Sequence, residues 1–324
     1  MRKLLVMLLI TAPLAAFAKI WIVDSNPGST AKDFTTINAA HADASAGDTL
    51  YLIGSPVNYT NATLTITKRL VIIGPGYFLG ENPNTQANLG TAFMGSGAFS
   101  ISFAAGSEGS VITGVEFRGG FTVSSNNIVV KRNYFFNNSV SINASNVVFI
   151  QNYFGANVAV GPGHSNVLIS NNYIASSISN AAGSMVEISN NIINSTVSAN
   201  TATVQNNLIR HSGVNYFTGS VVRNNFAFAG SNLPAGNGNT LLPEANFNAG
   251  FINTASTDGR WQLSASSPFK GAGYNGEDCG IFGGLTPYVL SGLPPVPSIY
   301  SLTAPSVGEV NSGLQVQIKA KSNN

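Results

Sequence analysis

The chain of 324 residues contains one cysteine, Cys279, so it has no pair that could form an internal disulfide bond. We expect Cys279 to be a small buried hydrophobic residue. Charged residues make up only 9% of the sequence. Without Arg2 and Lys3, which belong to the predicted leader, 15 − 2 = 13 basic residues face 13 acidic ones. This balance argues against nucleic acid as a partner.

The N-terminus has the pattern of a signal peptide over residues 1–18. Two basic residues precede an apolar run from Leu4 to Phe17, and small residues flank the predicted cleavage site after Ala18. The run is too short to span a bilayer, and we expect no transmembrane segment elsewhere. The sequence therefore predicts an exported bacterial protein, secreted or held at the cell surface.

A short motif recurs in the middle of the chain, where 39 asparagines of the whole sequence are most concentrated. The copies are VVKRNYF, VVFIQNYF, VLISNNYI, VEISNNII, TVQNNLI and VVRNNFA. The last asparagine of each copy advances in steps of 19, 20, 19, 16 and 18 residues, at Asn133, Asn152, Asn172, Asn191, Asn207 and Asn225. A repeat of this length buries its apolar face only by stacking on its neighbours.

The copy VLISNNYI shows how one coil is built. Alternation along a strand turns Val167 and Ile169 inward. The Asn171–Asn172 pair then turns the chain, since asparagine tolerates left-handed backbone. We expect the second asparagine of each pair to bond the next coil in a ladder. A leucine-rich repeat has a similar period, but it needs leucine at fixed sites where these copies use Val, Ile and Phe.

Two segments outside the repeats resemble secreted right-handed parallel β-helix proteins of the pectate-lyase-like superfamily. They are Asp33 to Gly76, which includes the sequence GDT, and Ser267 to Gly284, which resembles a final coil. The resemblance implies an all-β, single-stranded right-handed parallel β-helix over residues 19–290, with a short capping helix near Ile37 to Ala46. Residues 291–324 form a Pro-rich linker and tail, with one or two strands expected between Val307 and Ala320.

Family enzymes resemble one another in clustering carboxylates on one exposed sheet, yet the repeat region holds only Glu116 and Glu187. Four coils separate them, or about 19 Å, whereas catalytic carboxyl pairs lie roughly 5 to 9.5 Å apart. His164 and His211 are lone turn residues that we interpret as solvated. Arg118, Lys131, Arg132 and Arg223 fit scattered surface cations. We therefore predict no catalytic residue, no metal site and no cofactor.

One apolar column follows the asparagine pairs. The alternation places its six members on the outer face, over about 24 Å: Tyr134, Tyr153, Tyr173, Ile192, Leu208 and Phe226. Soluble monomers seldom leave such a strip bare. The favoured interpretation is that residues 232–253, or the tail after Leu293, lie across it. The alternative makes Tyr134, Tyr153, Tyr173 and Phe226 a surface for sugar rings or for a protein partner.

These patterns predict a non-catalytic binding or adhesion module, with extracellular polysaccharide as its ligand. The first alternative is a polysaccharide lyase or glycoside hydrolase. The second is a structural spacer in a surface assembly, because a fold by itself does not fix a function.

Overall fold

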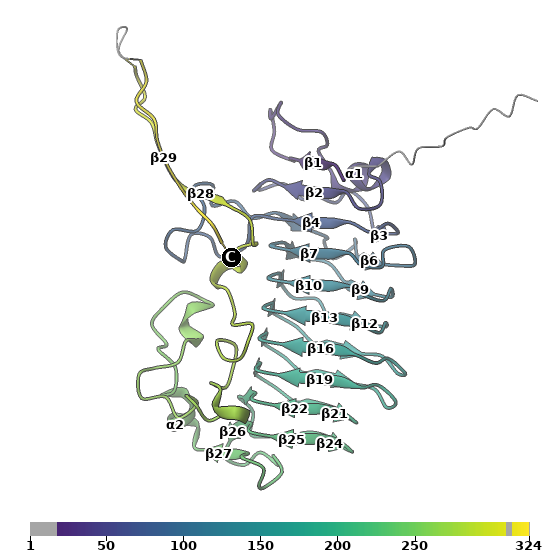
Figure 1. Cartoon of the computed structure of the whole chain (residues 1–324), viewed down its shortest axis with the longest axis vertical. Helices are drawn as coiled ribbons and strands as arrows, with labels where there is room; N and C mark the ends of the chain where they lie inside the picture. The colour runs from purple at the N-terminus through teal and green to yellow at the C-terminus, as the bar shows by residue number, and fades with distance from the viewer. Residues whose placement is uncertain (1–17, 309–312, 324) are drawn as a thin grey trace, which may run out of the picture.

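The computed structural model describes residues 18–308 and 313–323. Their strands wind into a parallel β-solenoid of about nine turns (Figure 1), which confirms the predicted all-β solenoid. Each complete turn adds one strand to each of three parallel sheets, here called A, B and C. The predicted signal peptide, apart from Ala18, lies outside the described residues.

Strand bounds follow the stacking order of each sheet. Sheet A contains β1 (Ile20–Val23), β2 (Thr49–Leu52), β4 (Val71–Ile73), β7 (Val111–Thr113), β10 (Val129–Lys131), β13 (Val147–Ile150), β16 (Val167–Ser170), β19 (Val186–Ser189), β22 (Thr203–Gln205) and β25 (Val221–Arg223). Sheet B contains β3 (Leu64–Ile66), β6 (Ile101–Phe103), β9 (Phe121–Val123), β12 (Val140–Ile142), β15 (Val158–Val160), β18 (Ile178–Asn180), β21 (Val197–Asn200) and β24 (Tyr216–Thr218). Sheet C contains β5 (Phe93–Met94), β8 (Glu116–Phe117), β11 (Tyr134–Phe135), β14 (Tyr153–Phe154), β17 (Tyr173–Ile174), β20 (Ile192–Ile193), β23 (Leu208–Ile209), β26 (Phe226–Phe228) and β27 (Thr240–Leu242).

Like side chains stack on like inside the solenoid, because every strand repeats the same alternation. Val167 and Ile169 point inward and are buried, as predicted. Phe117, Phe135 and Phe154 form an interior stack with ring centroids 4.9 and 4.7 Å apart. The core is therefore continuous from one end of the solenoid to the other.

The predicted asparagine ladder is present. Asn172 Nδ2 donates to Asn191 Oδ1 at 3.1 Å, and Asn172 Oδ1 accepts from Asn152 Nδ2 at 3.0 Å. Each Nδ2 also donates to a backbone carbonyl, as Asn172 does to Phe149 at 2.9 Å. One further rung lies at Asn239, which bonds Asn225 inside a segment for which the sequence predicted no repeat. Burial of fully bonded amides fixes the coils in one register.

The first residue of each turn pair has a left-handed backbone, and the second residue does not. The φ values of the first residue are 56°, 60°, 54°, 53°, 57° and 51° at Arg132, Gln151, Asn171, Asn190, Asn206 and Asn224. Asparagine is the non-glycine residue best suited to this conformation. Here the side chain turns outward at the corner between sheets A and C.

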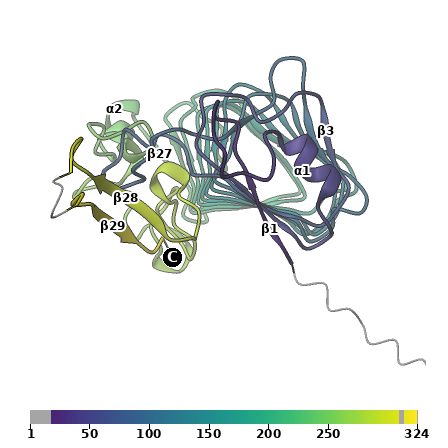
Figure 2. The same ribbon diagram turned by 90° about the horizontal axis from the view of Figure 1, so that it is seen from above.

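Helix α1 (Ile37–Asp43) covers the first coil, which confirms the predicted cap (Figure 2). Thr36 caps it, with its side chain accepting from Ala39 N at 3.3 Å. Ile37 and Ala40 are buried in the core. Lys68 Nζ donates to three carbonyls at the helix C-terminus, at 2.7 to 2.8 Å, where a cation is favourable.

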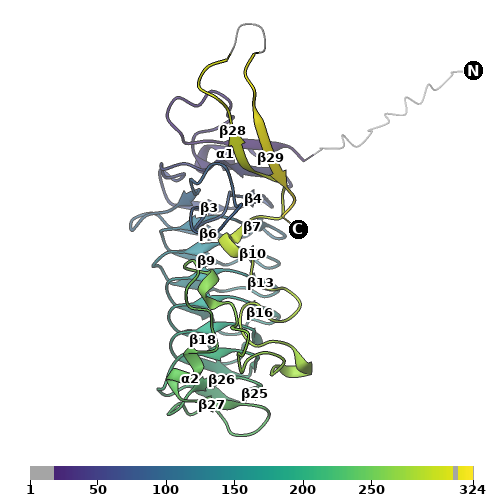
Figure 3. The same ribbon diagram turned by 90° about the vertical axis from the view of Figure 1, so that its left-hand side faces the viewer.

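After β27 the chain leaves the solenoid and returns along the outside of sheet C (Figures 1 and 3). We call residues 243–293 the strap. It contains α2 (Glu244–Asn248) and three short 3₁₀ segments, η1 (Gly259–Trp261), η2 (Tyr274–Gly276) and η3 (Leu290–Gly292). The predicted final coil at Ser267 to Gly284 is therefore wrong, because that segment runs across the coils instead of adding another.

The chain ends in an antiparallel ribbon, β28 (Ser298–Thr303) and β29 (Gln317–Lys321), that extends beyond the capped end (Figures 1 and 3). One of its strands lies earlier than the predicted Val307 to Ala320. In the part of the chain that the structure describes, no helix is long and apolar enough to cross a membrane.

Candidate functional site

The apolar column on sheet C points outward, as the alternation predicts, and the strap buries most of it. Tyr153 is 9% exposed, Tyr173 and Phe226 are each 6% exposed, and Ile192 and Leu208 are fully buried. The strap side chains packed over the column form a second core: Phe247, Phe251, Trp261, Phe269, Cys279, Ile281 and Tyr288. Only the first two fall in a segment that the sequence named as the cover.

This cover corrects the proposed binding role of Tyr153, Tyr173 and Phe226. Tyr153 and Tyr173 stack on each other with centroids 4.3 Å apart, and Tyr173 stacks on Trp261 at 4.9 Å. Burial raises the pKa of the Tyr153 hydroxyl far above its usual value, with further contributions from Tyr173. A sugar ring finds no open aromatic face at these three residues.

Side chains at the turn corners hold the strap in place. Asn171 Nδ2 donates to the carbonyls of Ile281 and Gly283 at 3.0 and 2.7 Å. Four neighbours of Asn171 in the turn series also donate to strap carbonyls, at 2.6 to 3.1 Å: Arg132 to Leu293, Gln151 to Pro287, Asn190 to Asp278 and Asn224 to Ala272. Sequence reasoning treated these residues as turn formers only. All of these residues have a side-chain N–H donor, and a row of such donors at the corners was the signal in the sequence that could have indicated a covering segment.

A buried polar cluster anchors the far end of the strap. Asp258 is fully buried and accepts from Asn82 Nδ2 at 2.8 Å and from Ser291 N at 2.6 Å. The Tyr288 hydroxyl lies 3.3 Å from Asp258 and 2.7 Å from the Tyr77 hydroxyl. Tyr77, Asp258, Tyr288 and Ser291 are buried and bonded, Asn82 is half-buried and bonded, and together they join the strap to the loop before β5.

The column emerges from under the strap at its N-terminal end. We call the residues there the open patch: Phe93, Glu116, Arg118, Tyr134 and Phe136. Register places Glu116 beside both Phe93 and Tyr134. Phe136 is 45% exposed, and its ring lies edge-on to Tyr134 with centroids 5.9 Å apart. Tyr134 is half-buried, and it is thus the one member of the proposed binding set that stays partly exposed.

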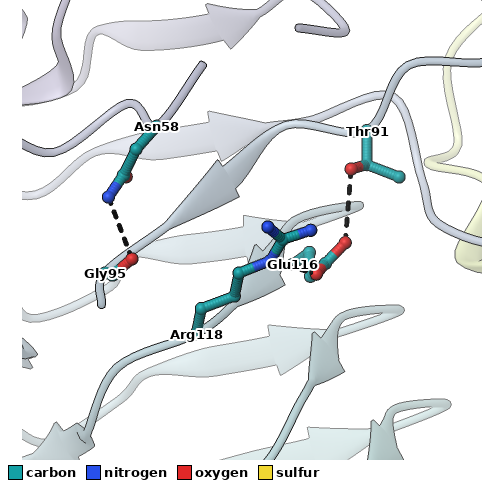
Figure 4. A network of polar contacts seen from close by, with 5 residues as sticks. All are labelled: Asn58, Thr91, Gly95, Glu116 and Arg118. Atoms are coloured by element: carbon teal, nitrogen blue, oxygen red, sulfur yellow. Dashed lines mark hydrogen bonds and ion pairs between the residues drawn. The ribbon is translucent and has the colours of Figure 1, made fainter. Parts of the chain in front are cut away.

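An ion pair lies at the centre of the open patch (Figure 4). Arg118 Nε lies 2.6 Å from Glu116 Oε1, and Thr91 Oγ1 donates to Glu116 Oε2 at 3.2 Å. The Arg118 guanidinium stacks 3.9 Å from the centre of the Phe93 ring, while its side chain is 43% exposed. Burial, followed by the charge of Glu116, raises the pKa of Tyr134 to about 12, so its hydroxyl stays protonated and able to donate.

The predicted separation of Glu116 and Glu187 by four coils is confirmed, and the structure adds that these two residues lie on different sheets. Glu116 belongs to β8 of sheet C, while Glu187 belongs to β19 of sheet A, four turns later. Glu81 is the second carboxylate whose charge raises the pKa of Tyr134, and it accepts a hydrogen bond from the backbone N of Thr257 at 2.7 Å. Among residues 18–308 and 313–323, no group of three His, Cys, Asp or Glu residues could hold a metal ion.

A groove of about 830 Å³ lies between the ribbon and sheet A. Tyr51, Leu89 and Tyr300 are among its lining residues, together with the amides of Gln86 and Asn88. Gln86 Nε2 already donates to Pro75 O at 2.8 Å, and Asn88 Oδ1 accepts from Gly90 N at 2.9 Å. Groups that orient a ligand are better supplied by the open patch, where donor and acceptor charges lie side by side.

No protein-family model matches the chain, and no curated protein matches it either. The part of the superfamily resemblance that the structure supports is therefore the parallel β-solenoid alone.

Proposed function

We propose that this protein is an exported, non-catalytic carbohydrate-binding module whose ligand lies on the open patch. The observation that carries the proposal is the Arg118–Glu116 ion pair between aromatic rings, in which the Arg118 side chain is 43% exposed and the Glu116 side chain is buried. Hydroxyls of a sugar could accept from the exposed guanidinium, which Glu116 holds in place, while the apolar face of the sugar packs on Phe136. Proteins use the same combination of apolar walls and a few polar groups to orient small ligands.

The carboxylate chemistry favours binding over turnover. Glu116 is 6% exposed and already shares its charge with Arg118 and Thr91. A general acid needs a carboxyl oxygen aimed at the leaving group, and both oxygens of Glu116 already have partners within the protein. Glu81 is bonded to the strap backbone. Hydrolysis through a Glu116–Glu81 pair remains the second candidate function, because both carboxylates act on Tyr134.

The first test is a panel of immobilised extracellular polysaccharides, in which retained protein and released sugar are both recorded. We expect retention without release. The informative variant is Arg118→Gln combined with Glu116→Gln, since removing one partner alone would leave a buried charge unpaired. Retention should fall at least about tenfold, which corresponds to about 1.4 kcal/mol. Lys270→Gln, an exposed charge change elsewhere, is the control.

Two results would overturn the proposal. Released sugar that disappears in Glu116→Gln and in Glu81→Gln would identify a hydrolase. Retention on no polysaccharide would leave the spacer in a surface assembly as the better account.

A further inference from the structure

A second polar feature lies at the other end of the strap-covered face. The backbone ladder of sheet C continues one residue past its strands, and this outer row runs from Arg118 to Arg210. The two arginines are five coils apart, or about 24 Å. Between them the row carries Phe136, Gly155, Ala175 and Asn194, and Arg210 lies half-buried beside the strap. Its surroundings are therefore separate from the open patch.

Two guanidinium groups lie against one indole here. The Cζ atom of Arg210 is 4.8 Å from the centre of the Trp261 ring, and that of Arg260 is 5.1 Å from it. Trp261 is 4% exposed, whereas Arg260 is exposed. Arg210 donates from Nη1 to Asn194 Oδ1 and from Nη2 to Asn248 Oδ1, both at 3.1 Å. Both acceptors are neutral amides, so they orient Arg210 without balancing its charge.

Neither guanidinium at this place has a carboxylate as a direct partner. Within the described ranges, the one ion pair of the chain is Glu116–Arg118, and neither Arg210 nor Arg260 lies within 4.0 Å of a carboxylate. Burial is the largest cause of the lowered pKa of the Arg210 guanidinium and Arg260 lowers it further, while Tyr173 and Glu244 raise it. Like charges over one ring oppose each other unless an anion lies between them.

Two buried donors add to this positive potential. Arg210 Nε and Trp261 Nε1 are closed to solvent and have no hydrogen-bond acceptor. The indole N–H is oriented near the Tyr153 hydroxyl without a full hydrogen bond to it. Because these atoms are inaccessible, they would stabilise an anion through their field and not by contact. The donors left for an anion are those of the exposed Arg260 and the Nη1 and Nη2 protons of the half-buried Arg210 that the two amides do not accept.

We propose that Arg210, Arg260 and Trp261 form an oxyanion-binding site, which takes a carboxylate, sulfate or phosphate group. Arg210, held by two amides and by the indole, is the fixed half of the site. Arg260 is exposed and closes on the anion from the solvent side. Arginine suits this role because its planar donors match two oxygens of one oxyanion. The site lies beyond the open patch and does not depend on the proposed function.

The test follows Trp261 fluorescence in the full chain with Trp21→Phe as the background, which leaves Trp261 as the only indole. Sodium sulfate, inorganic phosphate and sodium glucuronate are titrated separately at constant ionic strength, with chloride as the balancing ion. We expect a saturable change with at least one of the three, and the strongest of them names the source of the anion. Arg260→Gln should weaken that binding at least about tenfold, the loss expected for one charged hydrogen bond.

Lys270→Gln is the matched control, because Lys270 is an exposed strap cation outside the cluster. It should leave the affinity unchanged. A signal that never saturates, or one that Lys270→Gln weakens as much as Arg260→Gln does, would overturn the proposal. The double change at Glu116 and Arg118 should not alter the titration, so failure of the oxyanion site and failure of the carbohydrate proposal can be told apart.

Discussion

Sheets B and C of the same solenoid treat their outer faces in opposite ways. The outward column of sheet B carries small polar residues at nearly every coil: Thr65, Ser102, Thr122, Ser141, Ala159, Ser179 and Ser198. The outward column of sheet C carries aromatic and aliphatic residues at the same spacing. Within the residues that the structure describes, no segment crosses sheet B, while 51 residues (243 to 293) return along sheet C (Figure 2).

The comparison shows that the outward-facing residues determine whether a face of the solenoid is left exposed to water or is covered by another segment. The hydroxyl groups of one column can form hydrogen bonds with water. An apolar column instead leaves hydrophobic surface, which is stabilised when another part of the chain covers it. The C-terminal chain supplies that cover and forms a second core outside the first. The open patch is the part of the apolar column where the cover ends, and our proposal places the ligand there.

The largest expected effect tests whether the strap core is a true core. Phe269 is fully buried and contacts Phe226, Phe247 and Phe251. Phe269→Ala should lower the free energy of unfolding by about 3 to 5 kcal/mol, as for other buried phenylalanines. Urea denaturation measures the loss. Leu285→Ala, at a strap residue that is 95% exposed, is the control and should stay within about 0.5 kcal/mol. Equal effects of the two changes would mean that the strap is not packed.

A smaller effect is expected where the strap is tied to the coils. Asn171→Gly keeps the left-handed backbone but removes both hydrogen bonds to Ile281 and Gly283. Stability should fall by about 1 to 3 kcal/mol, and hydrogen exchange should rise in the strap before it rises in the coils. Asn127→Gly has the same backbone sign with φ of 61° and lies away from the strap. An unchanged exchange pattern in the strap of Asn171→Gly would contradict this role.

Cys279 reports on the closed strap through its ionisation. Burial, and then the charges of Asp278 and Glu277, raises the pKa of its thiol from 9.0 to about 12. Because the unfolded thiol ionises first, this group stabilises the fold fully below pH 9 and loses that contribution as the pH rises from 9 to 12. At pH 10 the loss is about 1.4 kcal/mol. Cys279→Ala should remove that part of the alkaline decline in urea titrations.

The same thiol should react slowly with a disulfide reagent at pH 8, because the native thiolate is scarce. Phe269→Ala should speed the reaction by opening the strap. Rapid labelling of the native wild-type protein would show that Cys279 is not covered.

The smallest effect is expected on the bare face. Ser179→Val, in the outward column of sheet B, should change stability by less than about 0.5 kcal/mol. Its counterpart Tyr173→Ser, in the covered column of sheet C, should lower it by about 3 kcal/mol or more. Calorimetry of the two variants compares the faces directly, and similar shifts in Tm would mean that the two columns do not differ in the way described.

Sequence reasoning predicted what repeats and missed what does not. The step between asparagines predicted the solenoid, the inward residues and the ladder, because each coil of a repeating fold places the same residue types at the same spacing in the sequence. The path of the strap followed no period, so Ser267 to Gly284 was read as one more coil. Asn239 was missed for the same reason, since its rung lies 14 residues after Asn225 inside a glycine-rich stretch.

The candidate site was only partly predictable. Alternation placed Tyr134 on the outside, but which members of its column stay uncovered depends on where the strap ends. Arg118 and Glu116 are recognisable in the sequence as charged residues. Their ion pair forms because residues two positions apart in the chain point to the same side of sheet C. Arg260 belongs to a segment with no repeat, so its approach to Arg210 had no signal in the sequence.

The most direct test of the account is the affinity of a retained polysaccharide for three proteins: wild type, Phe136→Ala and Tyr216→Ala. Phe136 is 45% exposed in the open patch, and Tyr216 is 58% exposed on sheet B. If the open patch binds carbohydrate, Phe136→Ala should raise the Kd by about tenfold, and Tyr216→Ala should leave it unchanged. An unchanged Kd in Phe136→Ala, or an equal rise in both variants, would contradict the central claim that binding is confined to the uncovered end of sheet C.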